Sequence, residues 1–353
     1  MRGASFDWVS PLDTAAGRIA HLLRRATFGA TAAEFDRAMS EGYGKTVDRL
    51  LDTPPVAPPV LADAPSRNLQ TLQQWWLDHM TSSPTPFAET MTLVWSGHFT
   101  SDYRKVGLQT PWVYWQNLSW RSMALGDFRS ILKTVTIDPA MLRYLDLGGS
   151  TGKSPNENYS RELMELFTLG AGTFGEADVQ AGAKALSGWR LPRATETTRT
   201  GIFDQTRAFT GPLTFLGKTA RFDTDLALDQ VLAQDATAPF MVRQVLATFL
   251  SPFPSAGLVT RLAARFRASK WDVKGLMRDV FLAPEFVAPE TYRSLVKAPV
   301  EFMVGAARAL GQPLGRLAAA SRPPRGAAWA RRSSTRRPSP AGAAVPASSR
   351  PTP

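Results

Sequence analysis

The sequence predicts an all-α fold: a single large domain of many helices, with one irregular loop or small hairpin at about 199–222. Three observations support this prediction. Apolar residues recur at intervals of three and four along most of the chain, as they do on the buried face of a helix. Capping residues stand where such stretches begin. Strand-like segments do not alternate with helical ones, which argues against a doubly wound sheet.

The first helices are marked by their starts and by their apolar faces. Thr31-Ala-Ala-Glu34 is a capping box, and Phe35 and Met39 follow it four residues apart on one face. Residues 44–52 place Val47, Leu50 and Leu51 on a short amphipathic face. The proline-rich stretch TPPVAPPVLADAP that follows predicts a rigid surface connection.

The region from Arg67 to Arg121 is rich in aromatic residues at helical spacing. Such residues are usually core, because each ring removes a large apolar area from water. The alternative is a platform on which bases or sugars stack. The aromatic residues concerned are Trp75, Trp76, Phe87, Trp95, Phe99, Trp112, Trp115 and Trp120.

The second half of the chain continues as helices. Asp138-Pro139 is an N-cap followed by proline at the first helical position. Gly, Pro, Thr and Phe dominate 199–222, which favours a loop or hairpin there. The predicted helices are 126–135, 138–146, 175–186, 224–234, 238–250, 256–269, 271–282 and 297–310.

The segment SPNENYSRELMELFTLG, residues 154–170, carries the densest group of polar side chains. Ser154 as N-cap, Pro155 at the first helical position and Glu157 three residues after the cap predict a capping box, and Gly170 predicts the stop. The predicted buried stripe consists of Tyr159, Leu163, Leu166, Phe167 and Gly170.

The polar residues of this segment admit a structural and a functional interpretation. Glu157, Arg161 and Glu165 are spaced four apart, and such a ladder stabilises an exposed helix by roughly 0.2–0.5 kcal/mol per pair. It explains Asn156 and Asn158 less well, because asparagine is a poor helix former. Near a helix start a glutamate has a lowered pKa, so Glu157 would act as a ligand or base before it acted as an acid.

Other chemistry-bearing motifs are few. The three histidines are His21, His79 and His98, and none forms a pair with HExxH spacing. The chain has no cysteine, which excludes disulfides, thiolate metal sites and a cysteine nucleophile. A zinc site is therefore weakly supported, and any metal or cofactor stays unknown. No GxSxG elbow, P-loop or dinucleotide fingerprint is present.

The charge of the chain is uneven. The net charge is +11, but residues 312–353 hold eight arginines and no acidic residue, so the remainder carries only +3. A near-neutral body argues against nucleic acid as a partner. We expect an N-terminal extension over 1–15, a helical domain over 16–314, and a disordered tail over 315–353.

The composition of the tail favours a further hypothesis. Of the 42 residues from Gln312, 35 are Ala, Arg, Pro, Ser or Gly, as in a GC-rich gene read out of frame. We therefore hypothesise that the native frame is lost shortly after Leu314; a basic arm for nucleic acid or membrane is the competing interpretation. No apolar run is long enough to span a membrane, and the start lacks a secretory pattern, which predicts a cytoplasmic protein.

Several segments taken together resemble a known bacterial family, the domain of unknown function DUF1800. The most specific block is NEN…RELMELFTLG within 154–170, and the similarity extends over 16–314. The other segments are HLLRRATFGAT (21–31), MTLVWSGHF (91–99), DPAMLRYLD (138–146), EADVQAGAKALSGW (176–189) and VKAPVEFMVGAARALGQPL (296–314).

The resemblance implies one helical domain, often exported in relatives, and frequently encoded beside a sulfatase-like partner protein. It implies no established reaction. Ser96 stands where the family often has a histidine, and Ala208 and Phe209 stand where a His-Asp pair is common, so this member has lost part of any site built on them. The polar signature of the family falls on His21, Arg24, Trp95, His98, Asn156, Glu157, Asn158, Arg161, Glu162 and Glu165.

Two functions follow from these residues. The first is an enzyme acting by hydrolysis or transfer on a polar, saccharide-like substrate, with Glu157, Glu162 and His98 as catalytic residues. Arg161 would hold an anionic group, and the remaining signature residues would bind and orient the substrate. The second is a non-catalytic helical accessory or binding protein, in which the segment forms an internal polar network that fixes helix packing.

Overall fold

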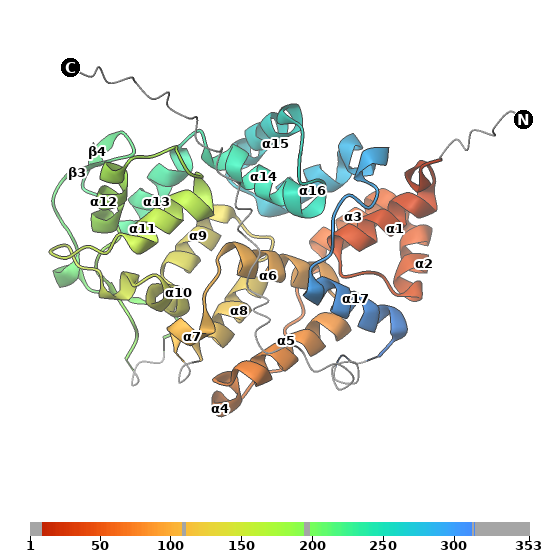
Figure 1. Ribbon diagram of the computed structural model, residues 1–353, viewed down its shortest axis with the longest axis horizontal. Helices are drawn as coiled ribbons and strands as arrows, with labels where there is room; N and C mark the ends of the chain where they lie inside the picture. The colour runs from red at the N-terminus through yellow and green to blue at the C-terminus, as the bar shows by residue number, and fades with distance from the viewer. Residues whose placement is uncertain (1–8, 108–110, 194–197, 313, 315–353) are drawn as a thin grey trace, which may run out of the picture.

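The computed structural model describes residues 9–107, 111–193, 198–312 and 314, and these confirm the all-α fold. Helices fill most of the described chain, and its strands form two short antiparallel pairs (Figure 1). Residues 1–8 of the predicted extension and the predicted tail, 315–353, lie outside the described residues. The α-helices are α1 (Ala15–Ala26), α2 (Ala32–Glu41), α3 (Tyr43–Asp52), α4 (Asp63–Ser66), α5 (Leu69–Ser82), α6 (Pro86–His98), α7 (Tyr103–Val106), α8 (Trp112–Ser122), α9 (Phe128–Thr136), α10 (Pro139–Tyr144), α11 (Asn158–Glu162), α12 (Glu176–Ala185), α13 (Thr224–Ala233), α14 (Thr237–Phe249), α15 (Ala256–Ala268), α16 (Val273–Leu282) and α17 (Pro299–Leu310).

The shorter elements lie between these helices. A π-helix, η3 (Leu163–Thr168), continues α11 without a break. Strand β1 (Trp189–Arg190) pairs with β2 (Ile202–Phe203), and β3 (Leu213–Phe215) pairs with β4 (Lys218–Ala220) as a hairpin, as predicted for 199–222. The 3₁₀ turns are η1 (Pro11–Asp13), η2 (Leu147–Gly149), η4 (Gln205–Arg207), η5 (Pro284–Val287) and η6 (Pro289–Thr291).

The chain is arranged along one long axis. Helices α1, α2 and α17 lie toward one end, while α11, α12 and the β3–β4 hairpin lie toward the other (Figure 1). Helices α6 and α8 lie between the two ends and pack on each other, and α14, α15 and α16 pack in sequence along one edge. Helix α17 packs on α5, so the last described helix is bound to the first third of the chain.

A large hydrophobic core runs through both ends of the molecule. Phe99, Phe128 and Tyr159 are buried in it, and a smaller cluster holds Trp75 and Trp76. Burial of each such side chain stabilises the fold by about 1.5–3 kcal/mol. The core interpretation of the aromatic region is therefore confirmed for most of its members; the exceptions, Trp112 and Trp115, are half-buried.

Helix starts agree with the capping residues in the sequence. The Thr31 hydroxyl accepts from the Glu34 N–H at 3.3 Å, and the Glu34 carboxylate accepts from the Thr31 N–H at 2.8 Å, which completes the predicted capping box. Asp138 caps α10 by accepting from the Met141 N–H at 2.9 Å. Met39 is 40% exposed, because α2 lies at the end of the molecule and the side chain that it buries is that of Ala38.

The predicted start of the 154–170 helix is wrong by three residues. Helix α11 begins at Asn158, because Ser154 is held in a turn where it exchanges backbone hydrogen bonds with Thr151. The Asn156 side chain, not that of Ser154, accepts the N–H of Asn158 at the helix start. Gly170 ends the segment with φ 88°, a conformation that favours glycine, as predicted.

The predicted buried stripe is also wrong at Leu166, and its last member, Gly170, is only half-buried. Tyr159, Leu163 and Phe167 are buried, but Leu166 is 46% exposed. The π-helix causes this difference, because its backbone bonds join residues five apart and its wider turn shifts the phase of every side chain after Leu163. Thr168 is fully buried instead.

Candidate functional site

Both asparagines of the NEN segment have local structural partners. The Asn156 carboxamide oxygen accepts from the Asn158 N–H at 2.9 Å, and the Asn156 N–H donates to the Ser150 hydroxyl at 3.0 Å. The Asn158 carboxamide donates to Asp146 Oδ2 at 3.2 Å. Asn156 thus initiates the helix, and Asn158 links it to the preceding turn. These contacts explain why two poor helix formers stand at this position.

Arg161 lies in a surface ion-pair network. Its Nη2 donates to Glu176 Oε1, from α12, at 2.7 Å and lies 3.6 Å from Glu157 Oε2. The Arg161 and Glu157 side chains are each 39% exposed. The close partner of Arg161 is thus a glutamate from the next helix rather than a residue of its own ladder.

Glu162 differs from the other carboxylates of the segment. It is half-buried, and within the described residues it has no hydrogen bond or ion pair. Burial raises its pKa, the neighbouring Glu165 carboxylate raises it further, and Arg161 opposes the effect. A carboxyl group of this kind holds its proton at higher pH than an exposed glutamate and can both donate and accept one.

The π-helix next to Glu162 is held by two side chains. The Thr168 hydroxyl donates to the Leu163 carbonyl at 2.5 Å, and His98 Nε2 lies 3.0 Å from the Phe167 carbonyl. A carbonyl can only accept, so His98 carries its proton on Nε2 and Nδ1 is left as an acceptor. Burial lowers the pKa of His98 to about 4, so the imidazole is neutral near pH 7.

Trp95 supports His98 from the core. The two rings contact each other with centroids 6.1 Å apart, and the indole N–H donates to the Ala124 carbonyl at 3.0 Å. Trp95 is only 2% exposed, so it has no free face for a ligand. Ala208 and Phe209, where the resemblance implied a His-Asp pair, lie against the backbone of Gly188 and Gly152.

His21 and Arg24 lie apart from this group. Both belong to α1, which lies toward the end of the molecule opposite α11 (Figure 1). Arg24 Nη2 lies 3.2 Å from His21 Nδ1. Burial, together with Arg25 and Arg24, lowers the pKa of His21 to about 4, so the guanidinium donates to a neutral imidazole. The signature residues therefore form two groups, one around α11 and His98 and one on α1.

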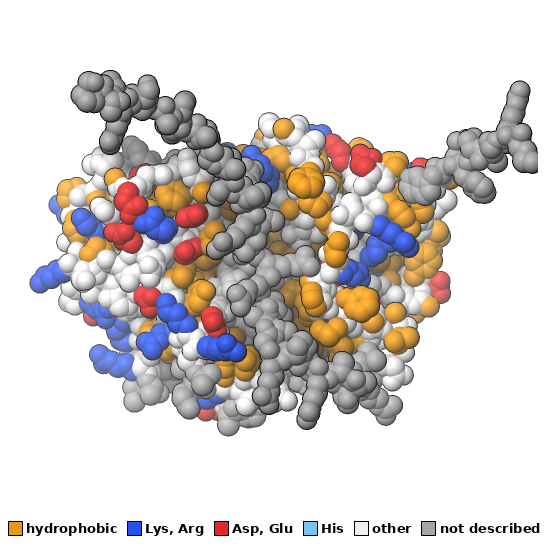
Figure 2. Space-filling view, viewed as in Figure 1, with side chains coloured by type: hydrophobic (Ala, Val, Ile, Leu, Met, Phe, Trp, Pro, Cys, Tyr) orange, Lys and Arg blue, Asp and Glu red, His pale blue; other side chains and the backbone are white. Residues whose placement is uncertain are grey.

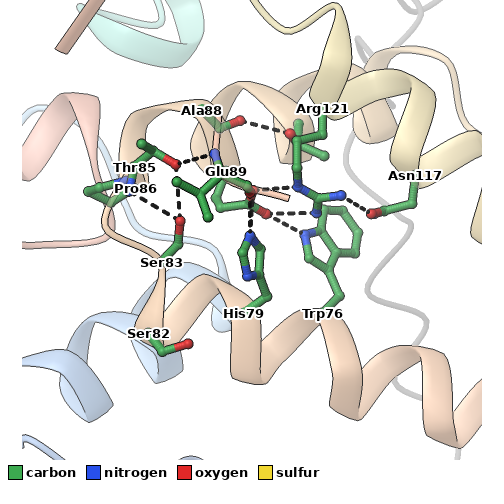
Figure 3. A network of polar contacts seen from close by, with 12 residues as sticks. Trp76, His79, Ser82, Ser83, Thr85, Pro86, Ala88, Glu89, Asn117 and Arg121 are labelled. Atoms are coloured by element: carbon green, nitrogen blue, oxygen red, sulfur yellow. Dashed lines mark hydrogen bonds and ion pairs between the residues drawn. The ribbon is translucent and has the colours of Figure 1, made fainter. Parts of the chain in front are cut away.

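A buried polar network lies between the two groups and was not predicted from the sequence. Glu89, fully buried on α6, accepts from Arg121 Nε at 2.5 Å and Nη2 at 2.9 Å (Figure 3). The Trp76 indole donates to it at 3.1 Å, and His79 Nε2 lies 3.3 Å away. The only sequence signal was a single glutamate in the apolar run PFAETMTLVW.

The contacts of Glu89 indicate a structural role. Burial alone would raise its pKa, but the hydrogen bonds from Arg121 and His79 outweigh it, and the net pKa is lowered. The carboxylate is thus charged and fully partnered, as a buried ion has to be. Asp138 is a different case, because burial raises its pKa to about 7 despite the hydrogen bonds from Met141 and Gln116.

The described residues provide no cluster of metal ligands, and their best-defined surface hollow lies away from α11. Within the described ranges, no three histidine or acidic side chains are grouped so that they could hold a metal ion. A shallow surface hollow of about 660 Å³ lies on α5 and not at α11. It is lined by Leu61, Asn68, Gln70, Thr71, Gln74, Trp75 and Asp78.

These features define a helical protein whose candidate site is a carboxylate-bearing α-to-π helix supported by a neutral histidine. The sequence pattern of the family described as "Protein of unknown function (DUF1800)" matches residues 21–342, and the chain belongs to this family. No curated protein and no solved structure matches the chain. None of the helices in the described ranges has the length and apolar character needed to cross a membrane.

Proposed function

We propose that this protein is an enzyme that catalyses hydrolysis or transfer on a polar, saccharide-like substrate by proton transfer at Glu162. One observation carries the proposal: a half-buried carboxyl group with a raised pKa and no internal partner among the described residues, beside a second carboxylate, Glu165. Two neighbouring carboxyl groups can supply an acid and a base at the same site, as they do in glycoside hydrolases.

The neighbouring side chains support this assignment. Arg161 is positioned to interact with an anionic substrate group, since only part of its donor set is used by Glu176 and Glu157. Glu157 is a weaker candidate than Glu162, because Glu157 Oε2 lies 3.6 Å from Arg161 Nη2, whereas Glu162 has no ion pair among the described residues. The π-helix that follows supports the proposal in a general way, because such segments occur frequently at functional sites.

Glu162→Gln tests the proposal most directly. Hydrolysis of a panel of 4-nitrophenyl glycosides and esters would be measured for wild type, Glu162→Gln, Glu165→Gln and the matched control Glu176→Gln. We expect Glu162→Gln to lower kcat by about 10²–10⁴-fold and Glu176→Gln to leave it nearly unchanged. Full activity in both Glu162→Gln and Glu165→Gln would refute the assignment.

A second measurement does not need a substrate. The side-chain carboxyl ¹³C shift of Glu162 would be followed by NMR against pH, with Glu176 as the reference. We expect Glu162 to titrate above an ordinary glutamate and Glu176 below it, as their surroundings dictate. A Glu162 that titrates with or below Glu176 removes the basis of the proposal.

A non-catalytic accessory or binding protein is the second candidate, including one that acts with the sulfatase-like partner that the resemblance implies. The observation that favours it is that Asn156, Asn158 and Arg161 are already engaged in internal contacts. In that case Glu162→Gln would change neither partner binding nor any activity of the complex.

A further inference from the structure

Four cationic side chains meet where the end of α1 faces the segment leading into α17. Arg24 lies at their centre, with its guanidinium and that of Arg293 each 5.3 Å from the ring centroid of Tyr292. Its charge also acts on two further neighbours, Arg25 and Lys297. We call this group the α1–α17 cationic cluster: Arg24, Arg25, Arg293 and Lys297.

The charge of the cluster is not neutralised within the described residues. None of its members forms an ion pair with a described carboxylate, and Glu301 acts on Arg25 and Lys297 only from a distance. The Glu301 carboxylate is instead the acceptor for the Ala298 N–H at the start of α17. Arg308, on the same helix, shows the contrast, because it is paired with Glu34 at 2.6 Å.

Three members of the cluster are held in place by neutral acceptors. Arg25 Nη2 donates to the Thr291 carbonyl at 2.8 Å and lies 3.0 Å from the Ser294 hydroxyl. Lys297 donates to the Phe28 carbonyl at 2.7 Å, and Arg24 donates to His21. These bonds fix the positions of the cations without cancelling their charge, and they leave donors unused, among them the buried Nε of Arg25.

Holding like charges together in partial burial is unfavourable. Burial and the neighbouring cations lower the pKa of Arg24 and of Lys297, and they lower that of Arg25 to about 10. A bound anion would remove this cost, and three guanidinium groups match the several oxygens of a phosphate or sulfate better than a single carboxylate does.

We propose that the α1–α17 cationic cluster is a binding site for a phosphate-type oxyanion. The site is separate from the proposed acid–base site on α11 and does not depend on it. The oxyanion belongs either to a soluble ligand or to a lipid headgroup. Figure 2 shows Lys and Arg side chains over α1 beside hydrophobic ones over α17, where Phe302 is 66% exposed.

The test uses inorganic phosphate and sulfate as probes, with ionic strength held constant by chloride. Binding would be measured by isothermal titration calorimetry for wild type, Arg24→Gln, Arg293→Gln and the control Arg265→Gln. Arg265 is a surface arginine of α15 that is paired with Asp279. We expect saturable binding that weakens about tenfold or more in Arg24→Gln, several-fold in Arg293→Gln and not in Arg265→Gln.

Two further arms keep the result decisive. Arg293 is exposed and has no hydrogen bond within the described residues, so Arg293→Gln tests the site even if Arg24→Gln does not fold. Co-sedimentation with phosphatidylglycerol vesicles, against phosphatidylcholine alone, identifies a headgroup as the source if Arg293→Gln abolishes it. No saturable binding of phosphate, sulfate or anionic vesicles, or equal weakening by Arg265→Gln, overturns the proposal.

Discussion

Glu89 carries a negative charge into the centre of the molecule. The surrounding side chains neutralise this charge and donate hydrogen bonds to both carboxylate oxygens. Arg121 supplies two hydrogen bonds, Trp76 a third, and His79 lies beside the same carboxylate. Arg121 is in turn held by the Asn117 carboxamide at 2.9 Å. Helices α5, α6 and α8 are therefore joined through one carboxylate.

Removal of Arg121 is expected to be strongly destabilising. Arg121→Met leaves Glu89 buried without its main counter-charge, which costs about 3–5 kcal/mol of unfolding free energy. Urea denaturation would measure it, with Arg265→Met as the control, since Arg265 belongs to an exposed pair worth about 0–1 kcal/mol. Equal stabilities of the two variants would show that the network contributes no more than a surface pair.

At the scale of elements, the α11–η3 helix shows how a backbone irregularity is stabilised. The Thr168 hydroxyl, fully buried, donates to the Leu163 carbonyl five residues earlier. The His98 Nε2–H likewise donates a hydrogen bond to the carbonyl of Phe167. Two side chains thus add hydrogen bonds to carbonyl groups of the π-helix, beyond the backbone bonds that join its residues five apart.

Thr168→Val tests the first of these contacts. Valine keeps the shape of threonine but cannot donate to the Leu163 carbonyl, so we expect a loss of about 0.5–1.5 kcal/mol of unfolding free energy, the net value of one hydrogen bond. Thr168→Ser retains the hydroxyl and should recover the part of this loss that comes from the hydrogen bond. Thermal and urea unfolding of both variants would measure these differences in unfolding free energy. A Thr168→Val protein as stable as wild type would contradict the expectation.

The same helix marks the limit of prediction from sequence. Starts such as Thr31 and Asp138 were predictable, because a capping side chain acts on the backbone within three residues of itself. The exposure of Leu166 was not, because a π-helix has no local capping signal and only changes the phase of the pattern. Within the candidate site, Glu162 was named but could not be ranked above Glu157, since the main partner of Arg161 comes from another helix. Glu89 was missed for the same reason: Arg121 is 32 residues away in sequence.

At the scale of the whole molecule, two buried groups, His21 and Asp138, and the half-buried His98 make stability depend on pH. His21 and His98 have folded pKa values of about 4 against an ordinary 6.5, so they reduce stability as pH falls from about 6.5 toward 4. Asp138 acts in the opposite direction: its folded pKa of about 7 lies above its ordinary 3.8, so its contribution is lost as pH rises from about 4 to 7.

Asp138→Asn separates these effects. Asparagine is also a good N-cap but does not titrate, so the variant should gain stability relative to wild type as pH rises, by up to about 1.4 kcal/mol per unit between pH 4 and 7. Urea unfolding at several pH values would measure the difference. Asp127→Asn is the matched control, since Asp127 caps α9 in an exposed position. A constant difference across this range would mean that Asp138 does not titrate there.

The contacts between α1 and α17 also set a condition on how the chain reaches its final structure. The carbonyls of Phe28 and Gly29, just after α1, accept from Lys297 and Arg308, which follow 269 and 279 residues later. At synthesis rates of about 5–20 residues per second, a ribosome needs roughly a quarter of a minute to a minute to produce that length. The carbonyls at the end of α1 therefore stay without these two donors until α17 has been synthesised. The N-terminal helices leave the ribosome long before the helix on which they pack has been made.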